Sequence, residues 1–357
     1  MFLTALVFFA ILSILVLIHE FGHYAVARLI GVHVEEFGLG LPPRVIGKKI
    51  GNTIYSLNWL PIGGFVRLAG EDEVDRPKSK VLSPKSKMYF WARSKKERAA
   101  ILVAGVTMNF LLAVGLTGYL LSQGVLEPSG RVRIEKIQPG SPAETIGLLE
   151  GDSITFIEQK QVTIPRDLID TTRAHLGENV TLTIVRDKNE TQMTVIPRKN
   201  PPAGQGPLGV VITDLELRTY SLLEIPGEAI RINIVRAKDM FAGIIGTLWR
   251  LATLKAPSSD VAGPIGIARV TGEAVKFGWK AVIEFMSILS LNLAVLNILP
   301  IPALDGGRLA FVFLEKLIGR KLRPAFEHSA HQMGMIILLG LILLVSINDI
   351  LRLTKGL

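Results

Sequence analysis

The chain has 357 residues, of which 49% are hydrophobic, and its mean hydropathy is +0.40. It contains no cysteine, which excludes disulfide bonds, thiolate metal ligands and a cysteine nucleophile. The net charge of +9 does not indicate a nucleic-acid partner, because the basic residues cluster beside apolar stretches, as they do in membrane proteins.

Four apolar stretches predict transmembrane helices. The first runs from Phe2 to about Val32, and because no signal-peptide cleavage site precedes His19, we expect this stretch to be retained. The other three stretches, none of which carries a charge, are residues 99–123, 285–304 and 333–347. The chain is therefore predicted to be a polytopic α-helical membrane protein with about four spans.

Lysine and arginine residues predict the orientation of these spans. One basic segment precedes the second span and consists of Arg76, Lys78, Lys80, Lys85, Lys87, Arg93, Lys95, Lys96 and Arg98. Another lies between the third and fourth spans and consists of Lys316, Arg320, Lys321 and Arg323. Because basic loops tend to remain in the cytoplasm, we expect both segments there, and both termini and residues 124–284 outside.

Residues 129–199 differ in kind from the spans. Short runs of alternating apolar and polar residues, separated by turn signals such as Gly151-Asp152, predict a compact, mainly β domain with one or two short helices. Residues 201–207 are rich in proline and glycine and predict a linker. Residues 226–255 are apolar but interrupted by charges, which favours an interfacial amphipathic helix.

These patterns divide the chain into four regions. Residues 1–128 hold the first two spans and residues 129–200 form the soluble domain. Residues 201–284 contain the linker and the interfacial segment, and residues 285–357 hold the last two spans.

The segment His19-Glu20-Phe21-Gly22-His23 places three titratable groups inside the first span. It has the H-E-x-x-H pattern, in which two histidines four residues apart share one face of a helix and can bind one Zn²⁺ ion. Glu20 can then act as a general base on a metal-bound water. Ionisable residues deep in a membrane span are costly and usually functional, so this segment predicts a zinc site inside the membrane.

A catalytic zinc ion needs one more protein ligand. The candidates are His33, His175, His328, His331 and the acidic residues, and Asp305 is favoured by its depth. Counted along their spans, His19 and Asp305 reach similar depths near the cytoplasmic face. Pro300 and Pro302 prevent a regular helix before Asp305, and Gly306 with Gly307 permits close backbone approach after it. Irregular backbone at membrane depth is tolerated where it lines a buried cavity that contains water.

These motifs together resemble the site-2 protease family of intramembrane zinc metalloproteases, in its bacterial, PDZ-containing regulator of sigma-E protease type. The H-E-F-G-H segment and "NILPIPALDGG" (297–307) carry the resemblance, and "QPGSPAETIGLLEGDSI" (138–154) is similar to a PDZ domain. "PIGGFVRLAGED" (61–72) resembles the family's membrane-reentrant β-hairpin on the cytoplasmic side. The G-x-x-x-N element of the second span is met by Gly105 and Asn109, although Val106 replaces a proline that is frequent in the family.

The resemblance implies a role for each matching residue. It makes His19, His23 and Asp305 the zinc ligands and Glu20 the general base, and it gives Asn297 and Asn292 contacts with the substrate backbone. The hairpin residues Gly63, Gly64, Phe65 and Val66 would then offer a free β-edge to an unwound substrate.

The resemblance also implies the setting and the partners. It implies a multi-pass protein of the bacterial cytoplasmic (inner) membrane, whose PDZ-like α+β domain is extracytoplasmic. Its substrates would be single-span membrane proteins or their cleaved remnants, such as anti-sigma factors or signal-peptide remnants. The PDZ-like domain could recruit substrates or exclude them. Two other functions compete with hydrolysis: a catalytically inactive PDZ-bearing scaffold, and a metal transporter.

Overall fold

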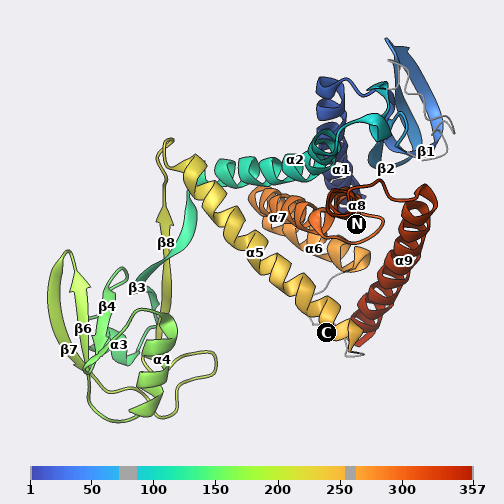
Figure 1. Cartoon of the computed structure of the whole chain (residues 1–357). Coiled ribbons are helices and arrows are strands. Elements are labelled where there is room, and N and C mark those ends of the chain that lie inside the picture. The colour runs from blue at the N-terminus through green and yellow to red at the C-terminus, as the bar shows by residue number, and fades with distance from the viewer. Residues whose placement is uncertain (1, 72–86, 254–262, 356–357) are drawn as a thin grey trace. The chain divides into compact units, whose positions relative to one another are not determined.

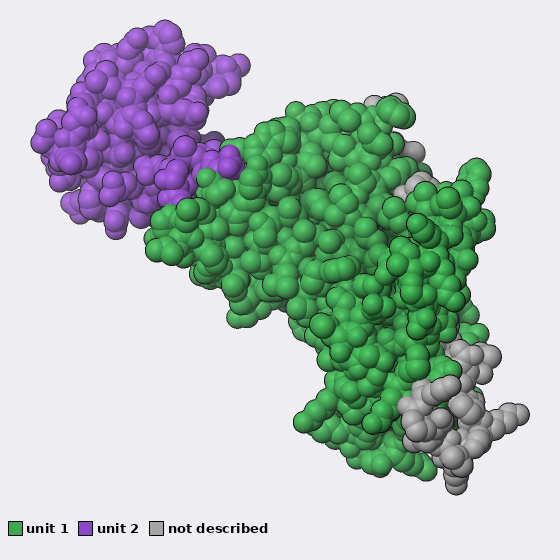
Figure 2. Space-filling model, turned by 90° about the horizontal axis from the view of Figure 1, so that it is seen from above, with its two compact units in different colours: residues 1–122, 221–357 green, residues 123–220 purple. Residues whose placement is uncertain are grey.

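The computed structural model describes residues 2–71, 87–253 and 263–355. The chain forms two compact units, residues 1–122 with 221–357 and residues 123–220 (Figure 2). We call the first the helical unit and the second the sheet unit. Four residues of the predicted cytoplasmic segment lie outside the described residues: Arg76, Lys78, Lys80 and Lys85.

Four helices in the described part of the chain are long and apolar enough to cross a bilayer, as the sequence predicts. They are α1 (Phe2–Ile30), α2 (Lys95–Ser122), α7 (Trp279–Ile298) and the Ala325–Leu351 part of α9 (Pro324–Lys355). Helix α7 ends before the predicted limit of the third span at residue 304, because Pro300 and Pro302 follow it and cannot continue a regular helix.

Helix α2 is the centre of the helical unit. It packs against α1, α7, α5 (Ile225–Ala252) and α8 (Asp305–Ile318) (Figure 1). Small hydroxyl residues join it to α7: Ser290 Oγ donates to the Asn109 carbonyl at 2.8 Å, and Ser287 Oγ to the Ala113 carbonyl at 3.0 Å. Such residues allow apolar helices to approach closely and to bond without water.

The predicted interfacial segment 226–255 forms α5, with residues 254 and 255 outside the described part. One side of α5 contacts α2 and α7, where the fully buried Asn233 donates to Thr117 Oγ1 at 2.9 Å. The other side exposes large apolar residues: Ile230, Ile234, Phe241, Ile245 and Trp249. An apolar outer face of this extent suits lipid better than water.

Helix α6 (Pro264–Phe277) joins the far end of α9 to the bundle. The buried carboxylate of Asp349 accepts hydrogen bonds from the backbone N–H groups of Gly263 and Gly266, at 3.0 and 2.9 Å. These N–H groups have no partner within their own helix, and a negative charge there is also favoured by the helix dipole.

A long antiparallel hairpin follows α1, formed by β1 (Val34–Ile50) and β2 (Thr53–Leu68), and β2 packs against α1 (Figure 1). Phe65 and Val66, which the sequence places in a hairpin, lie in β2 and pair with Gly38 and Phe37. The distal part of the hairpin exposes apolar residues: Val45, Ile46, Ile50, Leu57 and Trp59. A short 3-10 helix, η3 (Phe90–Ala92), precedes α2.

The sheet unit is an antiparallel sheet with two helices. Its strand order is β7-β6-β4-β3-β8, and β5 pairs with β4. The strands are β3 (Val125–Ile137), β4 (Ser153–Ile157), β5 (Lys160–Gln161), β6 (Val180–Arg186), β7 (Asn189–Val195) and β8 (Val210–Arg218), and the helices are α3 (Pro142–Thr145) and α4 (Pro165–Ala174). The predicted alternation is visible in burial, since Val132, Ile134, Val180, Leu182 and Ile184 all lie in its core.

The sheet unit extends beyond the predicted domain range 129–200 at both ends. Strand β8, which lies within the predicted linker region 201–284, pairs with β3 along its length, from Val125 with Arg218 to Ile137 with Val210. These backbone hydrogen bonds join both ends of the unit into one sheet, which sets its limits at Gln123 and Tyr220.

A buried ion pair connects α2 to α8. Arg98 donates to the fully buried carboxylate of Glu315, and the Lys95 ammonium donates to the Glu315 carbonyl at 2.9 Å. Charges removed from water in this way remain stable only while both partners are present. The pair therefore fixes the start of α2 against the helix that carries Asp305.

We expect Glu315→Leu alone to destabilise the helical unit by about 3–5 kcal/mol, because it leaves the Arg98 charge buried without its partner. The double change Arg98→Met with Glu315→Leu should recover most of that loss. Thermal unfolding in detergent measures both variants. As a control, Glu284→Ala removes the exposed partner of Arg236, 3.2 Å away, and should change stability by about 1 kcal/mol or less. Equal losses for the single and double changes would contradict the assignment.

Candidate metal centre

His19 and His23 lie one turn apart on α1 and face the same direction. Both side chains are buried, and their Nε2 atoms are 3.2 Å apart. A regular helix places residues i and i+4 above one another, so the unbroken helix from Phe2 to Ile30 is sufficient to present two imidazoles together.

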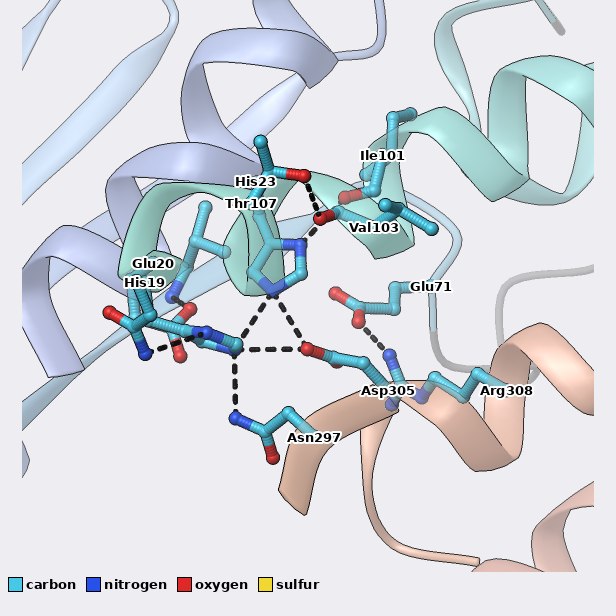
Figure 3. Close-up of polar contacts among 12 residues, drawn as sticks. His19, Glu20, His23, Glu71, Ile101, Val103, Thr107, Asn297, Asp305 and Arg308 are labelled. Carbon is cyan, nitrogen blue, oxygen red and sulfur yellow. Dashed lines mark hydrogen bonds and ion pairs between the residues drawn. The ribbon is translucent and has the colours of Figure 1, made fainter. Parts of the chain in front are cut away.

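Asp305, the first residue of α8, completes a three-residue cluster (Figure 3). Its Oδ2 atom lies 2.9 Å from Nε2 of His19 and 3.1 Å from Nε2 of His23. Two ligand atoms about 2.05 Å from a tetrahedral ion are about 3.3 Å apart, so the three atoms have the spacing of one metal site. Within the described residues this is the group of histidine and acidic side chains that converges in this way.

The other histidines lie elsewhere. His33 lies just after α1, where its backbone N–H donates to the Met88 carbonyl. His175 lies in the sheet unit, where its Nδ1 donates to the Thr171 carbonyl. His331 Nδ1 accepts a hydrogen bond from the Ala303 N–H at 2.9 Å, so this ring contacts the loop before Asp305. His328 lines a neighbouring cavity with His331.

The loop between α7 and α8 brings Asp305 to the histidines. Two prolines end the helical path, and Ala303 adopts a positive φ of 81°. A side chain could not be accommodated at the glycines that follow, since a Cβ on Gly306 would lie 2.5 Å from the Ile298 carbonyl carbon and one on Gly307 2.8 Å from that of Ile301. The glycine pair therefore permits the loop to fold back on the start of α8.

Glu20 lies beside the cluster and contacts the hairpin. Its Oε2 atom accepts a hydrogen bond from the Val66 N–H of β2 at 3.0 Å. Glu20, His23 and Asp305 line one cavity of about 270 Å³. The same cavity is lined by Phe65, Val66, Glu71, Arg308, His331 and Met335, among others.

The structure separates the predicted substrate-contact residues into two groups. Phe65 and Val66 line the cavity, and Asn297 Nδ2 lies 3.5 Å from His19 Nε2 (Figure 3). Gly63 and Gly64 instead lie against Val16 and Leu17 of α1, and Asn292 is half-buried on α7 and does not line this cavity.

The donor chemistry suits a divalent cation. Two imidazoles and two carboxylates meet at a cavity between helices, and the Arg308 guanidinium in the same cavity is paired with Glu71. Carboxylates that are partly removed from water favour a compensating charge, and a metal ion bound to nitrogen and oxygen ligands supplies it.

Two glycines shape this site in a way that the sequence analysis did not assign to them. A Cβ on Gly22 would lie 2.5 Å from the Ala104 carbonyl oxygen, and one on Gly105 would lie 2.7 Å from Cε1 of His19 and against His23. These glycines let α1 and α2 touch at the histidines. The G-x-x-x-N element marked Gly105, whereas nothing in the sequence indicated the Arg308–Glu71 pair.

The chain is similar in sequence to known proteins along nearly its whole length. A model of Peptidase family M50 matches residues 7–341. The chain belongs to this family. It is 33% identical over 352 residues to a predicted zinc metalloprotease of Clostridium perfringens, covering 97% of this chain and 98% of that one. It is 30% identical to the zinc metalloprotease RasP of Shouchella clausii, covering 98% and 99%. The resemblance indicated by the sequence motifs is thus confirmed.

Solved structures match the chain over a smaller part. The PDZ domain of an SdrC-like protein from Listeria innocua covers 23% of this chain and 92% of its own, with 19% identity and a TM-score of 0.21. A Listeria monocytogenes counterpart gives 20% identity and a TM-score of 0.22.

We expect Gly105→Ala to abolish metal retention, because the added methyl group occupies space that the two imidazoles need. Metal content per purified chain, measured by mass spectrometry, tests this. Gly115→Ala is the matched control, since a Cβ at Gly115 on the same helix meets no atom within 4 Å. A Gly105→Ala chain with full metal content would show that the contact between α1 and α2 does not constrain the site.

Proposed function

We propose that the chain is a zinc-dependent endopeptidase that cleaves membrane proteins in or near their transmembrane segments. The observation that carries the proposal is the convergence of His19, His23, Asp305 and Glu20 on one cavity among apolar helices. Membership of a peptidase family, with relatives named zinc metalloproteases, supports the reaction and the metal. A scaffold would have no use for a carboxylate placed as Glu20 is, and the internal repeats that transporters favour are not found between spans one–two and three–four.

In this proposal His19, His23 and Asp305 hold the zinc ion. The ion, when bound, acidifies a water molecule and polarises the carbonyl of the scissile bond. Two neutral imidazoles and one carboxylate would leave the site of a divalent ion with a net positive charge, so these ligands would not neutralise the ion.

Glu20 then serves as the general base. Its carboxylate lines the same cavity as His23 and Asp305, where it can take the proton of the attacking water and pass it to the leaving amine. The hydrogen bond from Val66 holds one of its oxygens in place and leaves the other available.

The substrate must be unwound before its carbonyl can react, since a transmembrane helix satisfies its own backbone groups. The backbone of β2 at Phe65 and Val66, apart from the Val66 N–H that donates to Glu20, and the amide of Asn297 supply replacement partners beside the ligand cluster. Gly63, Gly64 and Asn292 support this binding from further away. We take the substrates to be single-span membrane proteins or their cleaved remnants.

For localisation we propose the bacterial cytoplasmic membrane, with the sheet unit, taken as PDZ-like, outside and the hairpin re-entering from the cytoplasmic side. The distribution of basic residues supports this orientation. A contact between the two basic segments agrees with it. Lys321 of the second segment donates at 2.9 Å to the carbonyl of Trp91, which lies between residues of the first segment, so both segments are at the same side of the helical unit.

Glu20→Gln should retain about one zinc ion per chain and lower the rate of cleavage by at least about 10²–10⁴-fold, because an amide cannot accept the proton of water. Metal analysis and cleavage of a reconstituted membrane peptide measure the two quantities on one preparation. Loss of zinc together with activity would instead assign Glu20 a role in holding the metal.

Asp305→Asn should lose most of its zinc and its activity, because an amide oxygen is a weak zinc ligand. His328→Ala is the control, since the structure places His328 outside the ligand cluster, and it should retain both. Zinc titration of both purified variants gives the answer. If Asp305→Asn keeps its zinc while His328→Ala loses it, the ligand assignment is wrong.

Reporter fusions near Lys87 and near Lys321 should be located in the cytoplasm, and a fusion near Lys188 should be located outside. An enzyme that is active only outside the cytoplasm serves as the reporter. Activity at Lys87, or its absence at Lys188, would invert the proposed orientation.

A further inference from the structure

We propose that one face of α2 forms the outer shell of the metal centre, with Asn109 as a positioning residue that sets the tautomer of His19. The face consists of Ile101, Gly105 and Asn109, which are spaced four residues apart and so lie on one side of the helix. This inference rests on the proposed function, because it assumes that the histidines bind zinc.

The polar contacts of this face are with the Nδ1 atoms of both imidazoles, which point away from the cluster. His23 Nδ1 donates to the Ile101 carbonyl at 2.8 Å (Figure 3). Nδ1 of His19 lies 3.5 Å from the side-chain amide nitrogen of Asn109. Between them, Gly105 leaves space for both rings.

The proton positions follow from the direction of the rings. Nε2 of each histidine faces Asp305 Oδ2, at 2.9 Å for His19 and 3.1 Å for His23. A ring nitrogen that binds zinc carries no proton, so Nδ1 must carry one and must donate it. His23 meets this requirement through the Ile101 carbonyl.

His19 needs an acceptor at the same place, and Asn109 can supply it. Its amide nitrogen cannot accept a hydrogen bond, but its Oδ1 atom is buried without a hydrogen-bond partner among the described residues. A half-turn of the amide exchanges nitrogen and oxygen, which gives His19 Nδ1 an acceptor and Oδ1 a donor and leaves the amide nitrogen in the former position of Oδ1. The proton on His19 Nδ1 then has an acceptor, as zinc binding through Nε2 requires.

The backbone holds Asn109 where this contact forms. The residue is fully buried, and its carbonyl accepts a hydrogen bond from Ser290 Oγ of α7 at 2.8 Å. An asparagine also provides the acceptor without placing another negative charge beside the carboxylates of Glu20 and Asp305.

Zinc affinity tests the inference directly. The full chain is purified in detergent, and its dissociation constant for zinc is measured by competition with a chromophoric chelator. Asn109→Leu, which keeps the shape and removes the acceptor, should bind zinc about 10–100-fold more weakly. Asn109→Asp, which restores an acceptor, should bind within a few-fold of the unaltered chain.

Asn233→Leu is the matched control. Asn233 is also a fully buried asparagine in the helical unit, but its amide contacts Thr117 and the Ala229 carbonyl. It should lower thermal stability and leave zinc affinity unchanged. The visible absorption of the cobalt-loaded chain should shift in Asn109→Leu and remain the same in Asn233→Leu.

The outcomes separate the two levels of the proposal. Asn109→Leu with unaltered zinc affinity and an unaltered cobalt spectrum overturns the role of Asn109 and leaves the proposed function standing. An unaltered chain that binds no zinc overturns the proposed function and this inference with it. If Asn109→Leu does not fold, as judged by thermal unfolding of the metal-free chain, Asn109→Ala provides the same comparison without the bulk.

Discussion

Two imidazoles and two carboxylates meet among apolar helices, where lipid cannot satisfy their remaining hydrogen-bonding capacity. Each of these groups therefore depends on a protein partner behind it. Helix α2 supplies a carbonyl to His23, strand β2 supplies an N–H to Glu20, and the loop before α8 delivers Asp305. The positions of α2, β2 and the loop before α8 are therefore those that the four side chains need for their contacts.

The need for close partners explains why the backbones are so near one another at the site. Gly22 and Gly105 let α1 contact α2, and Gly306 and Gly307 let the α7–α8 loop turn sharply. The buried pair of Arg98 and Glu315 then fixes α2 against α8, some way from the metal cluster. Contacts through glycines and polar side chains therefore hold these helices close together at the site, where no hydrophobic driving force acts between helices in lipid.

The parts of this molecule that could be predicted from its sequence are those governed by local periodicity. The four apolar helices follow from the lengths of their apolar stretches, and the convergence of His19 and His23 follows from helical spacing. The partner of each group could not be predicted in the same way, because the Ile101 carbonyl and the Val66 N–H are backbone groups that every sequence contains.

Strand pairing between distant parts of the chain also could not be predicted from the sequence. Strand β8 lies beyond a proline- and glycine-rich segment and pairs with β3, more than seventy residues earlier, so no local pattern joins the two. Strand β1 is interrupted by Pro42-Pro43 and several glycines, which obscures its alternation. The position of Asp305 was accessible because its depth along the span matches that of His19 and because two prolines mark the irregular backbone before it.

The separation of the proposed ligands along the chain has a consequence for synthesis of the protein. His23 and Asp305 are 282 residues apart, and Asp305 follows the entire sheet unit and α7. At a ribosomal rate of about 5–20 residues per second, the histidines are made roughly 15–60 seconds before the aspartate. A nascent chain therefore lacks one of the three proposed ligands throughout that interval. On this ligand assignment, the metal site is completed only after α7 has been made and α8 has begun.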